Sequence, residues 1–250
     1  MSDSRAQAAL RFAGVAKRYG EHAALAEVSF EVMPGESFGL AGVNGAGKTT
    51  LIKCLLDLTA PDAGEISIFG VVAGLHSARA RLAYLPERFM PPHYLNGREF
   101  LGMMAGLRGG AYDDEAARRM LDRLDLDTAA LAKPVRDYSK GMTQKLGLAA
   151  CFMADCDLLI LDEPMSGLDP KARARVKHLL SEWRGKGRTL FFTSHALADI
   201  EEICERLAVL HGGQLRYLGA PLDLVQQSGA SNLESAFLAT IGESIAAHQP

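Results

Sequence analysis

Apolar and polar residues alternate in two stretches near the start of the chain, residues 10–15 and 24–32. Such alternation is typical of strands that have one face buried and one face in water. The second stretch leads into a turn at residues 33–36, and a further candidate strand at 65–70 follows the turn cluster at 59–64. The pattern therefore predicts that the chain opens with antiparallel strands.

A second kind of apolar segment is short and nearly continuous, which indicates strands that are covered on both faces. These segments are residues 37–41, 81–87, 156–161, 188–193 and 206–210. Stretches with helical spacing separate several of them, such as the one that carries Val176, Leu179 and Trp183 on one side. Alternating strands and helices predict an α/β fold with a mostly parallel sheet and right-handed crossovers.

From about residue 96 to residue 153 the pattern is helical throughout, with Asp113 and Asp114 in a first helical turn. We therefore predict a single domain over residues 1–250, with a helical subdomain at 96–153 inserted into an α/β core. The predicted core comprises residues 8–90 and 154–220, and a helical tail covers 221–250. Ser231 and Glu234 have the spacing of a capping box that would open the tail helix.

Residues 42–49, Gly-Val-Asn-Gly-Ala-Gly-Lys-Thr, have the spacing of a phosphate-binding loop between a strand and a helix. The glycines allow a tight turn whose N–H groups point inward, and the following helix adds its positive end. Lys48 would neutralise the β- and γ-phosphates, and the Thr49 hydroxyl would bind Mg²⁺. The predicted ATP-binding residues of this segment are Asn44, Gly45, Ala46, Gly47, Lys48, Thr49 and Thr50. The alternative is a glycine-rich turn without a ligand.

Asp162 and Glu163 come directly after the buried strand at 156–161. Ligands of parallel α/β sheets gather at the carboxyl ends of the strands, so we expect both acids to face the bound phosphates. Asp162 would hold Mg²⁺, directly or through water, and Glu163 would polarise the attacking water. Considered alone, two adjacent acids after an apolar strand could also be solvated loop residues. The phosphate-binding loop elsewhere in the chain makes that alternative less favoured.

Composition narrows the class of protein further. With 48% hydrophobic and 23% charged residues and a net charge of −3, the chain reads as an ordinary globular protein without a dominant nucleic-acid-binding surface. No apolar run approaches the roughly 18 residues that span a bilayer. Residues 1–7 lack the layout of a secretory signal, so we expect a cytoplasmic protein. The four cysteines form no CxxC pair, which favours buried free thiols over a zinc site.

Taken in order, these motifs resemble the ATP-binding subunits of ABC transporters, and the resemblance covers nearly the whole chain. Residues 42–49 match Walker A, residues 158–163 match Walker B, and residues 166–169 match the D-loop. The resemblance implies a P-loop NTPase core, an N-terminal antiparallel β subdomain and an inserted helical subdomain. It also implies that Tyr19 stacks on adenine, that Glu163 is the catalytic glutamate and that His195 is the switch histidine. From the residues alone, Tyr19 could be a packed aromatic, His195 a capping or core histidine, and Asp169 a turn residue.

Two segments depart from the family pattern. Residues 138–142, Tyr-Ser-Lys-Gly-Met, stand where the family has the signature Leu-Ser-Gly-Gly-Gln, and they keep Ser139 and Gly141. The resemblance implies that these two residues contact the ATP bound by the opposite subunit. Glu87 replaces a glutamine that contacts Mg²⁺, and an ionised glutamate can accept but not donate a hydrogen bond. Both variants are similar to exporter subunits of the ABC-2 type.

The resemblance implies an ATPase that pairs head to tail with a second copy or a paralogue around two ATP and two Mg²⁺. Closing and opening of that dimer would power transport through a separate integral membrane permease, with the chain bound to the cytoplasmic face of the membrane and not inserted in it. Residues 88–94 would lie near the permease, although Phe89 and Tyr94 could instead join the helical subdomain to the sheet. A non-transport ABC ATPase and a nucleotide-gated binding module are the alternatives, and export and uptake both remain open.

Overall fold

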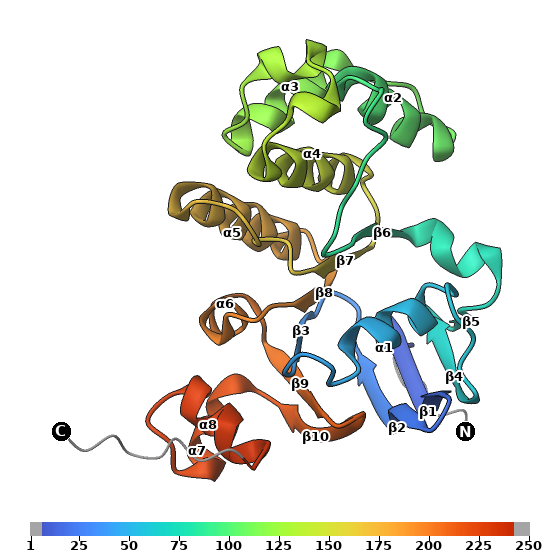
Figure 1. Ribbon diagram of the computed structural model, residues 1–250, viewed down its shortest axis with the longest axis vertical. Coiled ribbons are helices and arrows are strands. Elements are labelled where there is room, and N and C mark those ends of the chain that lie inside the picture. The colour runs from blue at the N-terminus through green and yellow to red at the C-terminus, as the bar shows by residue number, and fades with distance from the viewer. Residues whose placement is uncertain (1–6, 243–250) are drawn as a thin grey trace. The chain divides into compact units, whose positions relative to one another are not determined.

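The computed structural model describes residues 7–242. Contacts between residues that are close in space divide the chain into two compact units (Figure 1). The first unit comprises Met1–Arg81 and Gly187–Pro250, and the second comprises Leu82–Lys186. Our predictions for the first six residues, and for residues 243–250 of the tail, lie outside the described part. Within that part, no helix is both long and apolar enough to cross a bilayer.

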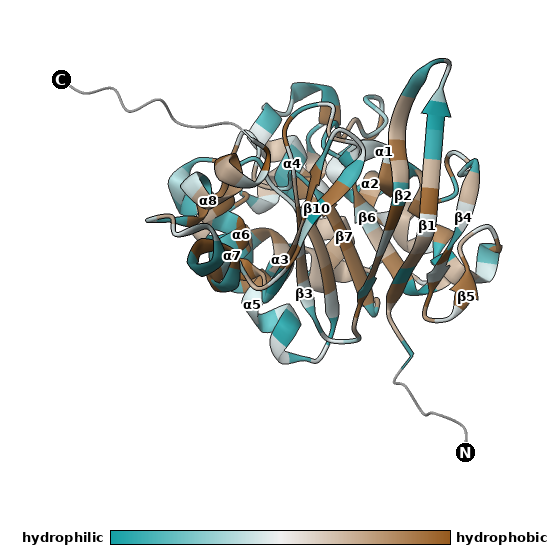
Figure 2. Ribbon diagram, turned by 90° about the horizontal axis from the view of Figure 1, so that it is seen from below, coloured by the Kyte–Doolittle hydropathy of each residue, from teal (hydrophilic) through white to brown (hydrophobic). Residues whose placement is uncertain are grey.

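An antiparallel sheet begins the first unit, with the strand order β2-β1-β4-β5. The bounds are Leu10–Tyr19 for β1, His22–Val32 for β2, Ala63–Ile68 for β4 and Val71–Val72 for β5. Leu10 of β1 pairs with Val32 of β2 on one side and with Ile68 of β4 on the other. Figure 2 shows the hydropathy of β1 and β2 changing along each strand, as expected for a sheet with one covered face.

The first unit also contains four strands of a mostly parallel sheet. They are β3 (Ser37–Ala41), β8 (Thr189–Thr193), β9 (Arg206–His211) and β10 (Gln214–Gly219). β3 lies between β8 and β9 and is parallel to both, while β10 is antiparallel to β9. All residues of β3 and β8 are buried, which explains why their sequences are continuous apolar runs.

Phenylalanines form the packed centre of the first unit. Phe12 of β1 stacks on Phe30 of β2 at 4.5 Å between ring centroids, and Phe30 stacks on Phe38 of β3 at 5.2 Å. Phe38 in turn stacks on Phe191 of β8 at 5.9 Å. Because these rings belong to both sheets, they fix the antiparallel sheet against the parallel one.

Helices follow the strands of the first unit. Their bounds are Lys48–Leu55 for α1, Leu197–Ile203 for α6, Pro221–Ser228 for α7 and Leu233–Thr240 for α8, and a 3-10 helix covers His76–Arg81. The capping box predicted at the start of α8 is wrong by one residue. Asn232 is the N-cap, and its side chain accepts a hydrogen bond from the Ser235 N–H at 2.8 Å.

The second unit combines two parallel strands with four α-helices. The strands are β6 (Leu82–Leu85) and β7 (Leu158–Asp162), with Leu82 paired to Leu158. The helices are α2 (Gly97–Leu107), α3 (Asp114–Arg123), α4 (Lys140–Met153) and α5 (Pro170–Gly185), and 3-10 helices cover Thr128–Ala132 and Val135–Asp137. Residues 96–153 are thus helical, as predicted, whereas the predicted division into core, helical subdomain and tail stays a prediction.

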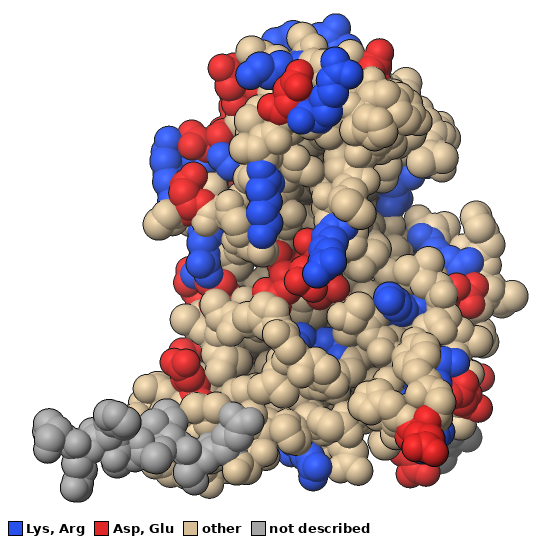
Figure 3. Space-filling model, viewed as in Figure 1, with Lys and Arg blue, Asp and Glu red and all other residues tan. Residues whose placement is uncertain are grey.

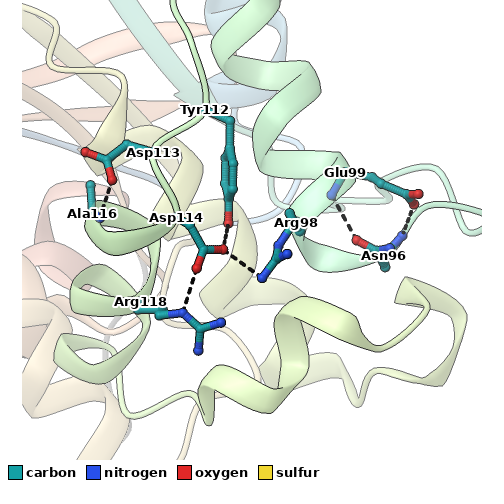
Figure 4. A network of polar contacts seen from close by, with 8 residues as sticks. All are labelled: Asn96, Arg98, Glu99, Tyr112, Asp113, Asp114, Ala116 and Arg118. Carbon is teal, nitrogen blue, oxygen red and sulfur yellow. Dashed lines mark hydrogen bonds and ion pairs between the residues drawn. The ribbon is translucent and has the colours of Figure 1, made fainter.

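Polar contacts fix the start of α2 and α3 (Figure 4). Asn96 and Glu99 form a capping box, in which each side chain accepts a hydrogen bond from the other residue's N–H. Asp114 accepts hydrogen bonds from Arg118 at 2.7 Å and from the Tyr112 hydroxyl at 3.0 Å, and it pairs with Arg98 of α2 at 2.8 Å. Around these helices Figure 3 shows basic and acidic side chains mixed over one face.

Candidate functional site

The predicted phosphate loop connects β3 to α1 with left-handed backbone at two glycines. Gly45 has φ 81° and Gly47, the N-cap of α1, has φ 110°. A Cβ at Gly47 would lie 2.5 Å from the Ala24 carbonyl oxygen, so this position admits only glycine without rearrangement. Among the described residues no side chain caps α1, and its first turn has no acidic residue, which favours an anion at this helix end.

Lys48 begins α1 and folds back over the loop. Its ammonium donates hydrogen bonds to the carbonyl oxygens of Gly42 at 2.6 Å and Val43 at 3.2 Å, and the side chain is buried. The charge is therefore held at the loop by the loop's own backbone. Thr49 is exposed in the first turn, and Thr50 is partly exposed.

The turn between β9 and β10 supports the phosphate loop from outside the motif. The N–H of Gly213 donates to the Ala46 carbonyl at 3.1 Å, and the Ala26 N–H donates to the Gly213 carbonyl at 2.8 Å. A Cβ at Gly213 would lie 2.9 Å from the Ala24 carbonyl oxygen, and its φ is 74°. Gly213 thus links β2 to the loop at a separation that leaves no room for a side chain.

Replacing Gly213 with alanine should displace the loop and weaken ATP binding by about tenfold, because the new Cβ collides with backbone atoms. Gly212→Ala is a matched control, since Gly212 lies in the same turn at φ 56° and a Cβ there meets nothing within 4 Å. A titration with a fluorescent ATP analogue would compare the two. Equal loss in both variants would show that only the turn conformation matters.

Tyr19 and His195 are both exposed residues of the first unit. Tyr19 ends β1 with half of its surface exposed, at 50%, so its ring is not a packed core aromatic. His195 follows β8 and is exposed, so it is not a core histidine. Ala196 is the N-cap of α6, and the Ala196 N–H donates to the Ser194 hydroxyl at 3.1 Å. The N-cap position of α6 thus belongs to Ala196, and the role of His195 stays a prediction.

Asp162 and Glu163 lie buried at the carboxyl end of β7, so the alternative of solvated loop residues is wrong. Glu163 has φ 51°, a left-handed conformation that is uncommon for a residue other than glycine. The Ser166 N–H donates a hydrogen bond to the Glu163 carbonyl oxygen at 3.1 Å, which closes the turn after the strand. The sharp turn directs the chain away from the strand immediately after Asp162.

Tyr84 of β6 lies near both Asp162 and Glu87. Burial, and then the negative charges of Asp162 and Glu87, raise the pKa of the Tyr84 hydroxyl. Two predicted metal residues of the second unit thus act electrostatically on one phenol. Among residues 7–242, no group of three or more His, Cys, Asp or Glu side chains could hold a metal alone. Carboxylates such as those of Asp162 and Glu87 are nevertheless oxygen donors of the kind that Mg²⁺ accepts together with substrate phosphates.

Ser139 is the N-cap of α4, the helix that follows the variant signature. Its hydroxyl accepts a hydrogen bond from the Met142 N–H at 3.2 Å, and its side chain is exposed. The Lys140 ammonium lies 3.3 Å from the Ser166 hydroxyl, and its methylene groups cover Gly167. A Cβ at Gly141 would lie 3.3 Å from the Gly167 carbonyl oxygen. The lysine that departs from the family pattern therefore ties the start of α4 to the predicted D-loop.

Comparison with known proteins identifies the family. The chain matches the protein family described as "ABC transporter" over residues 25–166, which is more than half of its length. It belongs to the ABC transporter family of ATP-binding proteins. The matched range includes the phosphate loop, the variant signature, Asp162 and Glu163.

Similar proteins refine this assignment. The ABC chain is 42% identical over 190 residues to an uncharacterized ABC transporter ATP-binding protein of Nostoc, a match that covers 75% of this chain and 57% of the relative. It is 37% identical over 226 residues to the Nod factor export ATP-binding protein I of Rhizobium etli, which covers 88% of this chain and 70% of the relative. The chain thus spans little more than half the length of the cyanobacterial relative.

Solved structures confirm the predicted fold class. A solved ATP-binding subunit of an ABC transporter matches with a TM-score of 0.84 and 30% identity, over 92% of this chain and 98% of that one. A dimeric ATP-binding cassette bound to ADP and phosphate matches with a TM-score of 0.78 over 84% of this chain and 98% of the other. At 21% identity, the second likeness shows the fold alone. The family match and the first structure confirm the predicted recognition and support the prediction of an ATPase.

Each unit of the ABC chain gathers part of the predicted site. The first holds the loop with Lys48, together with Tyr19 and His195, and the second holds Glu87, Ser139, Gly141, Asp162 and Glu163. Sequence reasoning missed Gly213, Tyr84 and the Lys140 contact, all of which lie beside predicted residues. A Gly-Gly pair after an apolar strand was the available signal for Gly213.

Proposed function

We propose that this chain hydrolyses ATP and powers export through a separate membrane permease of the ABC-2 type. The observation that carries the proposal is the uncapped helix end of the Gly42 loop, with the Lys48 ammonium already held over it. Such a site suits a chain of phosphates. Family membership supports a transporter, and the names of the Nod factor export relatives support export.

In this proposal, ATP binds with its phosphates against the loop N–H groups and Lys48, and with adenine stacked on Tyr19. Ser139 and Gly141 of a second copy, or of a paralogue, contact the γ-phosphate with the positive end of α4. Glu163 accepts a proton from the attacking water, and His195 helps to neutralise and position the γ-phosphate. Loss of that phosphate removes the contacts between the two subunits, so the dimer opens.

Mg²⁺, held by Thr49, Asp162 and Glu87, would neutralise the charge on the phosphate oxygens. Buried Asp162 would provide the fixed carboxylate, and Glu87, which is exposed, would accept hydrogen bonds from water. The proposal of Mg²⁺ rests on these oxygen donors, which are the ligands that Mg²⁺ prefers.

The permease is proposed to dock on residues 88–94 at the cytoplasmic face of the membrane. Met90 is 85% exposed and Tyr94 is 72% exposed, whereas Phe89 packs edge-on against Phe100 at 5.6 Å. A hollow of about 680 Å³ is lined by Glu87 and Met90 as well as by Lys140 and Gln144 of α4. The docking segment and the start of the signature helix therefore share one surface of the second unit, which would transmit a change at ATP to the permease.

The double substitution Met90→Ser and Tyr94→Ser should reduce co-purification with a co-expressed permease by about tenfold, because exposed apolar contacts would be lost. The ATPase rate of the isolated chain should stay unchanged. Leu222→Ser, on α7, is the control for an exposed apolar residue elsewhere. Undiminished co-purification of the double variant would contradict the docking surface, and a purified wild-type chain that releases no phosphate from ATP would contradict the ATPase.

A further inference from the structure

The end of β1, which carries Tyr19, is held by a side chain where the sheet itself stops. Residues 17–19 pair with β2 only, through Lys17 with Leu25, Arg18 with Ala23 and Tyr19 with His22. On the other edge, the last pair between β1 and β4 is Ala16 with Ala63. Within the described part of the chain, Lys17, Arg18 and the predicted adenine platform Tyr19 therefore have no strand on that edge.

Asp62 takes the place of the missing strand. Its own N–H donates to the Ala16 carbonyl at 2.8 Å, and its carboxylate accepts a hydrogen bond from the Arg18 N–H at 2.7 Å. The second carboxylate oxygen accepts a hydrogen bond from the Lys17 ammonium at 2.7 Å. Two consecutive residues before Tyr19 are thus bound by one side chain, on a strand whose pairing with β2 shifts register between Val15 and Lys17 and again between Lys17 and Arg18.

The Lys17–Asp62 pair also lies beside the helix of the phosphate loop. The Lys17 ammonium is 5.7 Å from the centre of the Tyr19 ring, and only 14% of the Lys17 side chain is exposed. Burial raises the pKa of the Cys54 thiol on α1, and the charges of Lys17 and Asp62 also act on it, in opposite directions. The pair therefore lies near the aromatic ring and acts electrostatically on a side chain of α1.

We propose that Asp62 is a positioning residue for the base of ATP, which sets where Tyr19 stands relative to the phosphate loop. This inference rests on the proposed role of Tyr19 in stacking on adenine. A base that stacks on Tyr19 while its phosphates lie on α1 requires a fixed separation between ring and loop. Asp62 holds the ring's strand at that separation and makes no contact with ATP itself.

Two consequences distinguish a role of Asp62 in positioning Tyr19 from a role in stabilising the fold as a whole. Loss of Asp62 weakens the binding of ATP, because a displaced ring stacks poorly, but it leaves the binding of a bare phosphate chain unchanged. It also leaves kcat at saturating ATP unchanged, since the contacts of Asp62 described above are with β1.

The test compares ATP and inorganic tripolyphosphate as competitors of a fluorescent ATP analogue on the full chain. Asp62→Ala is expected to weaken the affinity for ATP about five- to tenfold and to change the affinity for tripolyphosphate by less than about twofold. The expected loss is smaller than the loss on removing a whole stacking aromatic ring, because the ring is displaced and not deleted. Asp62→Asn, which can still accept one hydrogen bond, should show a smaller loss. Asp57→Asn is the matched control, because it removes another exposed ion pair of the first unit, that with Arg79. In a Tyr19→Ala background, Asp62→Ala should add nothing.

The outcomes separate the two proposals. Equal weakening of ATP and tripolyphosphate, or an unchanged ATP affinity in Asp62→Ala while Tyr19→Ala weakens it, would overturn the positioning role alone. If Tyr19→Ala leaves ATP affinity unchanged, or if wild-type binds ATP no more tightly than tripolyphosphate, the stacking role of Tyr19 and this inference fail together.

Discussion

Glu163→Gln is expected to lower the rate of ATP hydrolysis by about 10²- to 10⁴-fold, the usual contribution of a positioned general base, while ATP still binds. The amide has nearly the shape of the carboxylate but cannot accept a proton from water at neutral pH. Glu163 is buried in the turn after β7 with a left-handed backbone, so bulk water has little access to its carboxylate.

Phosphate release under saturating ATP measures this loss, and size-exclusion chromatography with ATP should show the variant as a dimer. Glu115→Gln provides the control, because Glu115 is an exposed residue on α3 whose side chain pairs with neighbouring Arg119 at 2.6 Å. Wild-type turnover in Glu163→Gln would refute the assignment of the base. A Glu163→Gln variant that stays monomeric with ATP, even beside its permease, would refute ATP-driven pairing.

Lys48→Ala is expected to weaken ATP binding by about 30-fold or more, the cost of removing one partner from a buried, hydrogen-bonded charge pair. In the free loop the ammonium is held by the carbonyl oxygens of Gly42 and Val43, so it is in place before the phosphates arrive. This preorganisation makes the expected loss large.

A fluorescent ATP analogue titrated into Lys48→Ala and Lys53→Ala gives the comparison. Lys53 lies on the same helix with an exposed side chain, and its removal should change affinity by less than about twofold. Thermal denaturation of both variants shows whether the chain remains folded. Similar affinities for the two variants, with both folded, would contradict the role of Lys48.

Much of the fold was predictable because its strongest signals are local. The buried strands β3, β7 and β8 read as continuous apolar runs, and the glycine spacing of the phosphate loop specifies its conformation within a few residues. Lys48 and Asp162 followed from those two signals. Family membership is confirmed, whereas the roles of the site residues stay predictions.

Features that depend on distant contacts were missed. Strand β10 has half-exposed residues in alternation and exists because it pairs with β9 across the Gly212-Gly213 turn. Asp62 reads as a turn residue in the sequence, because its partner Lys17 lies 45 positions earlier. At α8, Ser231 and Asn232 are both good caps, and local sequence does not choose between them.

The four cysteines of the chain are all buried in the fold. Burial raises the pKa of the Cys151 thiol to about 12 and raises the pKa of the Cys54 and Cys156 thiols. Maleimide reagents attack the thiolate, so these native positions will label slowly near neutral pH. A single cysteine introduced on the surface can therefore carry a spectroscopic probe in the otherwise native sequence, and the distance between two such probes would test the proposed pairing of subunits.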